Sequence, residues 1–315
     1  MKTKFLEKQM RKILFESIQD YLGDRQETIK ALPESPEYGF FTWFRAFREK
    51  DIKVKAKITF RAIPYGLRAV LGIRKSFKTL KKNPKIPISS ISPEGLHEFE
   101  EYAKSLGVDK IGYTKLTPEL IIENQELLYD NMIVVIKEMD KDLIAIAPHK
   151  KTMAMIMKTY FQMGKQVNKL ARFLRRKGFS VHAGPALGGL SLYPVLGQMA
   201  DLGVIGKHGL LITPEFGPRL RIAVIYTNIT NLPFAESNSY EWIYEFCQKC
   251  VSCIQTCPTQ AIFKTPIQKA HGRLTHIDVV ECAKGFLKFG CSICIKECPF
   301  NKNSPEKMKK IAEKQ

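Results

Sequence analysis

The sequence predicts an α+β protein in which an α/β sandwich is followed by a small cysteine-rich module. Two observations support this prediction. Strand-like apolar runs alternate with helical apolar patterns through the middle of the chain, which favours a sheet covered by helices. All eight cysteines then lie close together near the C-terminus. We therefore divide the 315 residues into a basic N-terminal helical region (1–85), an α/β domain (95–235), a cysteine-rich domain (240–303) and a basic tail (304–315).

Composition indicates a globular chain, since 44% of its residues are hydrophobic and a core can form. No apolar run is long enough for a membrane-spanning helix. Residues 1–20 lack the apolar core of a secretory signal and the twin-arginine pattern, so we expect a cytoplasmic protein. Thiols stay reduced in that compartment, and clustered cysteines there indicate metal ligands rather than disulfides.

Positive charge is concentrated at the N-terminal end. The whole chain carries +19, and residues 1–85 contain 21 Lys and Arg against 9 Asp and Glu, a net +12. Such a region favours anionic partners, namely nucleic acid, an acidic membrane surface or an acidic electron donor, although a merely solvated surface explains it equally well. Residues 5–21 show helical spacing. Residues 60–80 fit a helix packed on the main domain better than one lying on a membrane, because Pro64 and Gly66 interrupt the apolar pattern.

The elements of the α/β domain follow a linker over residues 83–93 that is rich in Pro and Ser. Ser92 is expected to open the first helix, and the β-branched run at 132–137 is typical of a buried strand. The run at 143–147 is expected to pair with it as a further strand. In chain order we predict a helix at 95–106, strands at 110–113, 132–137 and 143–147, a helix at 151–177, a strand at 179–182, a helix at 190–202, and strands at 210–213 and 219–226.

The cysteines form two motifs, each closed by a proline. The first has the spacing C-x2-C-x2-C-x3-C-P and the second C-x8-C-x2-C-x3-C-P. This spacing is typical of ligands to [4Fe-4S] clusters, whereas structural zinc usually has separated C-x2-C pairs. The motifs comprise Cys247, Cys250, Cys253 and Cys257 before Pro258, and Cys282, Cys291, Cys294 and Cys298 before Pro299.

A cubane cluster needs four thiolates at tetrahedral corners, and one tight loop supplies only three of them. In two-cluster ferredoxins the fourth ligand comes from the other motif. Cys282 is expected on a helix capped by Asp278, so it would reach its cluster from a helix. We predict two [4Fe-4S] clusters, one held by Cys247, Cys250, Cys253 and Cys298, the other by Cys257, Cys282, Cys291 and Cys294.

Residues 202–228 (LGVIGKHGLLITPEFGPRLRIAVIYTN), together with both cysteine motifs, resemble reductive dehalogenases and epoxyqueuosine reductases. The resemblance extends over roughly residues 130–301, and the second motif is closer to the dehalogenase layout. It implies cobalamin in a nitroreductase-like α/β sandwich followed by a bacterial-ferredoxin-like module. A low-potential donor of the ferredoxin or flavodoxin type and a small-molecule substrate are also implied. A histidine lower ligand is not expected, because no D-x-H-x-x-G motif is present.

The same resemblance suggests individual site residues. Lys207 matches a basic position, and in an apolar pocket its lowered pKa would suit proton donation. A surface lysine at a turn is the alternative. Tyr160 matches a tyrosine of the family helix and is a second candidate proton donor, with a core aromatic as the alternative. Lys207, His208, Gly209 and Leu210 are expected to contact the corrin, whereas His182 is expected to be a structural histidine.

The preferred hypothesis is a reductive dehalogenase-like oxidoreductase in which two clusters reduce cobalt, and cobalt reduces the substrate. Two alternatives stay open. A corrinoid-free, ferredoxin-like electron-transfer protein would use the basic region to dock a partner. An epoxyqueuosine reductase-like enzyme would act on tRNA, with an affinity that falls steeply with salt. Residues 184–194 (GPALGGLSLYP) lack the acid that epoxyqueuosine reductases carry there, which argues against the same proton donor.

Overall fold

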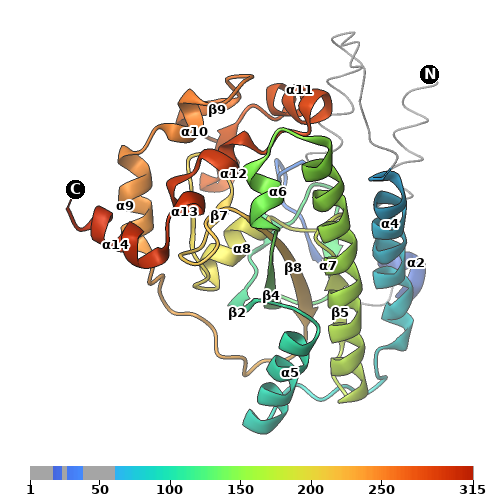
Figure 1. The fold of residues 1–315 in the computed structure, drawn as a ribbon. Helices are drawn as coiled ribbons and strands as arrows, with labels where there is room; N and C mark the ends of the chain where they lie inside the picture. The colour runs from blue at the N-terminus through green and yellow to red at the C-terminus, as the bar shows by residue number, and fades with distance from the viewer. Residues whose placement is uncertain (1–16, 23–26, 38–60, 315) are drawn as a thin grey trace.

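The computed structural model describes residues 17–22, 27–37 and 61–314 (Figure 1). Within these ranges no helix is both long and apolar enough to cross a membrane. The helix predicted over residues 5–21 lies mostly outside them, and only α2 (Gln19–Leu22) at its end is described. The predicted α+β class is confirmed.

A four-stranded antiparallel sheet forms the centre of the molecule, in the order β2, β4, β8, β5. Strands β4 and β8 pair along their whole length, from Asn131 opposite Thr227 to Glu138 opposite Leu220. Both are buried on both faces, as the β-branched run predicts. The strands are β2 (Lys110–Lys115), β4 (Asn131–Glu138), β8 (Leu220–Thr227) and β5 (Val181–Gly184).

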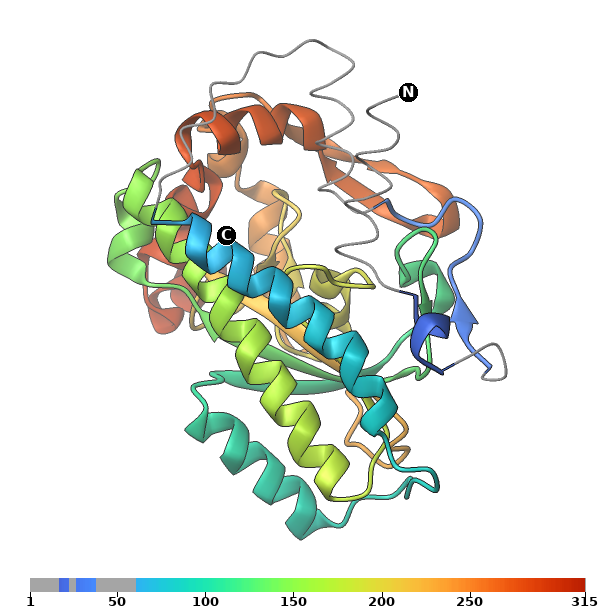
Figure 2. The same cartoon turned by 90° about the vertical axis from the view of Figure 1, so that its right-hand side faces the viewer.

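Successive side chains of a strand point to opposite faces, so the sheet separates two apolar cores. On one face, Ile133 and Val135 pack under α5 (Pro93–Ser105) and α7 (Lys150–Arg176). On the other, Val134 and Ile136 pack with α8 (Tyr193–Met199) and the end of α4 (Ile63–Lys78). Figure 2 shows α4 lying along α7.

Two glycines lie where α4 and α7 contact each other. A Cβ at Gly72 would lie 3.8 Å from the Cα of Gly164, an ordinary van der Waals distance, so an alanine would fit there without moving the helices. The side chain of Asn168 on α7 donates to the carbonyl of Gly72 at 3.0 Å. The packed helix preferred for residues 60–80 is therefore confirmed over Ile63–Lys78.

The predicted strand at 143–147 is wrong, because these residues belong to helix α6 (Lys141–Ala145) and the turn after it. The carboxylate of Asp140 accepts a hydrogen bond from the backbone N–H of Leu143 at 2.9 Å, which caps the helix. A short apolar run does not distinguish a strand from a buried helix by periodicity alone. The other predicted elements of the domain are present with shifted ends, and Ser92 caps α5 by accepting from Gly95.

The remaining elements are short and surround the sheet. Small antiparallel pairs join β1 to β3, β6 to β7 and β9 to β10. In chain order they are β1 (Ile29–Lys30), η1 (Thr79–Lys82), η2 (Pro118–Leu120), β3 (Glu126–Leu127), β6 (Val204–Ile205), β7 (Leu211–Ile212), α9 (Glu241–Lys249), α10 (Ser252–Gln255), β9 (Ile262–Gln268), η3 (Ala270–Gly272), β10 (Leu274–Ile277), α11 (Val279–Phe289), α12 (Ile293–Glu297), α13 (Pro299–Lys302) and α14 (Pro305–Ala312).

Arg219, just before β8, ties the cysteine-rich part to the sheet. Its side chain is buried, with Nη1 donating to Oδ1 of Asn301 at 2.7 Å and Nε donating to Oε1 of Glu138 at 3.0 Å. Next to it the backbone approach is tight, since a Cβ at Gly217 would lie 2.7 Å from the backbone of Phe300. The ends of the two central strands, β4 and β8, and α13 therefore hold each other in place.

Replacing Arg219 with methionine should destabilise the protein by about 2–3 kcal/mol, because a buried side-chain amide and a carboxylate lose their partner. Anaerobic urea denaturation would measure this loss. The matched control is Lys104→Met, which removes an exposed ion pair with Glu101 and should leave the midpoint unchanged. Equal midpoints for the two variants would contradict the role of Arg219.

Candidate metal centres

Short helices position the cysteines of the first motif. Cys247 lies in α9, Cys250 follows its last turn, and Cys253 lies in α10. Cys257 comes just after α10, and its sulfur accepts a hydrogen bond from the backbone N–H of Ala261 at 3.3 Å. Cluster thiolates commonly accept hydrogen bonds of this kind, which tune the cluster potential.

The second motif is arranged around two helix ends. Asp278 caps α11 by accepting from the N–H groups of Val280 and Glu281, which places Cys282 on the helix, as predicted. Gly290 ends α11 in the left-handed conformation (φ +59°), and Cys291 follows it. Cys294 lies in α12, and Cys298 stands between α12 and α13.

Four thiols line one small cavity, and they come from both motifs. Cys247, Cys250 and Cys253 of the first motif are joined there by Cys298 of the second. The backbone N–H of Lys207 donates to the sulfur of Cys247 at 3.4 Å. The structure thus brings together the four residues predicted for one cluster, with the fourth supplied by the other motif.

The other four thiols influence one another's ionisation, so they too lie close together. Burial first, and then the nearby thiols of Cys291 and Cys257, raise the pKa of Cys282 to about 11. The pKa of Cys294 is raised well above its ordinary value by burial first, and then by Cys282 and Cys291. The thiols of Cys282 and Cys294 are therefore protonated at neutral pH until a metal replaces the proton.

The donor spacing is wider than a single ion requires. In the described part of the chain no three His, Cys, Asp or Glu side chains converge closely enough to hold one metal ion. A cubane cluster instead binds each of its four thiolates to a different iron, so its ligands surround a larger group. Four cysteines around one cavity fit that arrangement.

An apolar cluster lies against the second thiol set. Cys294 and Phe286 pack there against buried residues of α6 and α7, including Ile144 and Met155. Tyr160 and Leu210, two of the residues predicted for catalysis and corrin contact, border the same cluster. The guanidinium of Arg221 lies over the ring of Tyr160, 4.7 Å from its centre, and sequence reasoning did not find this partner.

Lys207 and His208 face the first thiol set. The ammonium of Lys207 donates to the carbonyl of Gln248 at 2.7 Å, so the side chain is anchored at the end of α9 rather than placed in an apolar pocket. His208 is buried and lines the first thiol cavity, where burial lowers its pKa to about 4. Its Nδ1 accepts from the N–H of Leu210 at 3.1 Å. That these residues and Gly209 also contact a corrin stays a prediction.

His182 is buried, as a structural histidine would be, but within the described part of the chain it lacks the hydrogen bonds that such a residue usually makes. Its ring lies between Phe77 and Tyr226, and neither ring nitrogen has a hydrogen-bond partner in the described residues. Burial lowers its pKa to about 3, so the ring is neutral. Nearby, the hydroxyls of Tyr226 and Ser191 are hydrogen-bonded at 3.0 Å.

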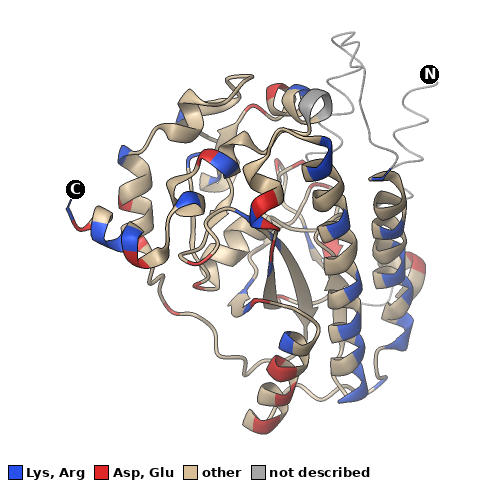
Figure 3. Ribbon diagram, in the orientation of Figure 1, with Lys and Arg blue, Asp and Glu red and all other residues tan. Residues whose placement is uncertain are grey.

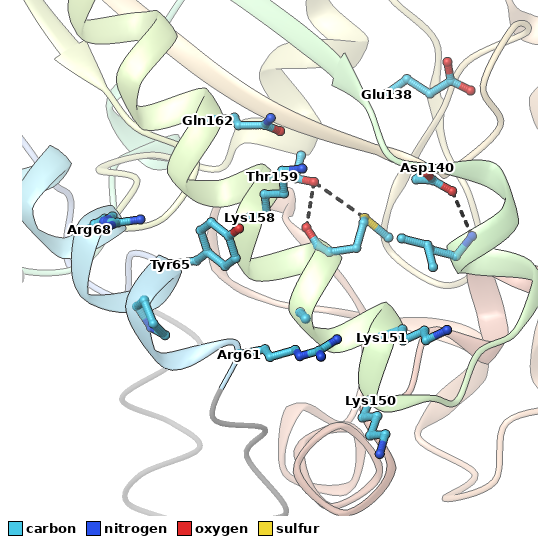
Figure 4. Close-up of a pocket in the computed structure, with 14 residues that line it drawn as sticks. Arg61, Tyr65, Arg68, Glu138, Asp140, Lys150, Lys151, Lys158, Thr159 and Gln162 are labelled. Carbon is cyan, nitrogen blue, oxygen red and sulfur yellow. Dashed lines mark hydrogen bonds between the residues drawn. The ribbon is translucent and has the colours of Figure 1, made fainter.

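A basic groove of about 1100 Å³ opens between α4, α6 and α7 (Figure 4). Two acids also line the groove. Glu138 accepts a hydrogen bond from Arg219, and Asp140 accepts one from the backbone N–H of Leu143. Met155 in its wall also belongs to the apolar cluster around Cys294. Sequence reasoning missed the groove because it joins segments far apart in the chain. Its cations are Arg61, Arg68, Lys150, Lys151 and Lys158.

Comparisons with known proteins point to two kinds of reductase, although no family model matches. The chain is 30% identical to a tetrachloroethene reductive dehalogenase of Desulfitobacterium hafniense, over 62% of this chain and 37% of that enzyme. It is 28% identical to an epoxyqueuosine reductase of Bacillus anthracis, over 65% of each chain. These homologues are oxidoreductases, and the chain spans little more than a third of the dehalogenase.

A solved catabolic reductive dehalogenase, NpRdhA in complex with 3-bromo-4-hydroxybenzoic acid, has the same fold. The two structures superpose with a TM-score of 0.73 at 20% identity, over 92% of this chain and 45% of that one. At this level of identity the likeness concerns the fold alone.

Single cysteine replacements test whether each cluster takes its fourth ligand from the other motif, an arrangement that we call crossed ligation. If the second motif completes the first cluster, Cys298→Ser and Cys250→Ser should disturb the same cluster, whereas Cys294→Ser should disturb the other. Electron paramagnetic resonance of the reduced variants would identify the cluster that remains in each. A Cys298→Ser spectrum that matches Cys294→Ser instead of Cys250→Ser would contradict crossed ligation.

Proposed function

We propose that this homologue of reductive dehalogenases and epoxyqueuosine reductases is an iron–sulfur oxidoreductase that passes electrons through two [4Fe-4S] clusters to a corrinoid and a small-molecule substrate. The observation that carries the proposal is the cavity shared by Cys298 with Cys247, Cys250 and Cys253. Residues 240–303 act in this proposal as a ferredoxin-like module. Its eight thiols require a reducing compartment, for which we propose the cytoplasm.

The proposed direction of electron flow follows from what surrounds the second thiol set. A ferredoxin- or flavodoxin-type donor would deliver electrons to the first set, in which Cys250 is half-buried and Cys247, Cys253 and Cys298 are buried. The second set borders the apolar cluster that contains Tyr160 and Leu210. Electrons would therefore leave through the second cluster, toward the α/β domain.

A corrinoid is proposed from the homology together with one local feature. Tyr160 and Leu210 border the cluster that contains Cys294, so a corrin held by residues 95–235, in a nitroreductase-like sandwich, would lie beside a reducing centre. Its cobalt would supply the low-potential reductant for the substrate. The chain's own part is to hold Tyr160 under the guanidinium of Arg221, where the phenol can donate a proton and the cation can stabilise an anion.

Reduction of an epoxyqueuosine-like nucleoside is the second candidate. The equal 65% coverage of this chain and of the epoxyqueuosine reductase favours it. Residues 184–194 contain no Asp or Glu, so the proton would have to come from another group such as Tyr160.

Adding cob(II)alamin to the anaerobically purified protein tests the corrinoid directly. We expect an electron paramagnetic resonance spectrum of base-off cobalt, because the chain has no D-x-H-x-x-G motif to supply a histidine ligand. Free cob(II)alamin in buffer is the reference. An unchanged spectrum with no retention of the cofactor on gel filtration would rule out the corrinoid and leave an electron-transfer protein.

Replacing Tyr160 with phenylalanine should lower substrate reduction by about a hundredfold, the usual contribution of one positioned proton donor. The iron content and the cluster spectrum should stay unchanged, because no thiol is altered. The control is Tyr102→Phe, since Tyr102 stacks on Phe173 at a distant site. Equal turnover in the two variants would remove Tyr160 from the proposal.

A further inference from the structure

Helix α4 presents two apolar faces, although it packs on the protein with only one. Ala69, Ile73 and Phe77 are buried beneath it. On its other side Ile63, Leu67 and Leu71, spaced four residues apart, are 43%, 64% and 60% exposed. Residues with this spacing lie in one row along a helix. An ordered row of exposed aliphatic side chains usually marks a binding surface.

The surroundings of this row are strongly basic. Helix α4 carries four Lys or Arg and α7 carries eight, and neither contains an Asp or Glu. Figure 3 shows the two neighbouring helices marked in blue without red. Within the described ranges, the exposed cations Lys75, Lys78, Lys158, Lys165 and Arg172 form no ion pair with an acid.

The basic groove continues this surface at the first turns of α4. Arg61, Tyr65 and Arg68 contribute one wall, and Lys150, Lys151 and Lys158 contribute to the other (Figure 4). Glu138 is paired with Arg219, and Asp140 caps α6 but keeps its negative charge, so the five cations outnumber the acids of the groove and leave it net positive. The groove is therefore suited to phosphate groups.

We propose that α4 and the adjoining groove bind the surface of an anionic lipid bilayer. Ile63, Leu67 and Leu71 would enter the boundary between headgroups and acyl chains, while the cations of α4, α7 and the groove would contact lipid phosphates. This site is peripheral and requires no spanning helix. None of the residues that form it is a proposed cluster ligand or proton donor.

Two other partners fit this surface less well. Single-stranded RNA is held by aromatic side chains that stack on bases, whereas the exposed row is aliphatic. A second copy of the chain would bring two basic faces together, and like charges oppose that contact. An anionic bilayer matches both the apolar row and the charge.

Vesicle co-sedimentation of the full chain with its clusters tests the proposal. We expect binding to vesicles of phosphatidylcholine and phosphatidylglycerol at about 3:1, and much weaker binding to phosphatidylcholine alone. The double variant Leu67→Gln/Leu71→Gln should lower partitioning about tenfold or more, because two leucines no longer leave water. Leu274→Gln removes a leucine that is 53% exposed on β10 and should change nothing.

A charge variant, Lys158→Glu/Lys165→Glu, should weaken binding to the anionic vesicles about tenfold or more, because two cations attracted by the lipid phosphates become two anions that the phosphates repel. Circular dichroism and cluster absorbance would establish that each variant is folded. Partitioning unaffected by either double variant would overturn the proposal. So would RNA binding in place of vesicle binding, or a leucine variant that alters only the oligomeric mass measured by light scattering.

Discussion

The position of Cys298 beside Cys247, Cys250 and Cys253 is the constraint on which the arrangement depends. Cys298 is the last cysteine of the chain, so the segment from β9 to α12 must fold back onto α9 and α10 to bring it there. The next residues form α13, where Asn301 receives the hydrogen bond from Arg219. The residue that closes the thiol cavity and the residue that docks the cysteine-rich part on the sheet are therefore close neighbours in the chain.

Helix α7 connects this module with the rest of the molecule. Met163 and Val167 pack on the sheet, Gly164 lies beside Gly72 of α4, and Met155 belongs to the apolar cluster around Cys294. One long helix thus separates the second thiol set from the basic groove. If a change at the groove moved α7, it would also shift the side chains around the second thiol set, and the reverse holds as well, because protein interiors are closely packed.

Prediction from the sequence succeeded where chemistry is local and failed where it depends on distant contacts. The spacing of the cysteines and the cap at Asp278 are read within a few residues, and the structure places Cys282 on a capped helix, as expected. The run at 143–147 was misassigned because the packing of Ile144 against Met155 and Ile156 of α7 decides its conformation, and the cap at Asp140 is its one local signal for a helix. The groove, and the contact of Arg221 with Tyr160, join segments separated by many residues, so no local pattern indicates them.

The central claim is that eight thiols hold two cubane clusters. The most direct measurement is the iron and acid-labile sulfide content of the anaerobically purified chain, together with its reduced electron paramagnetic resonance spectrum. Two clusters predict about eight irons and about eight sulfides per chain and a spectrum with spin–spin coupling. About four irons, or zinc in place of iron and sulfide, would contradict the claim.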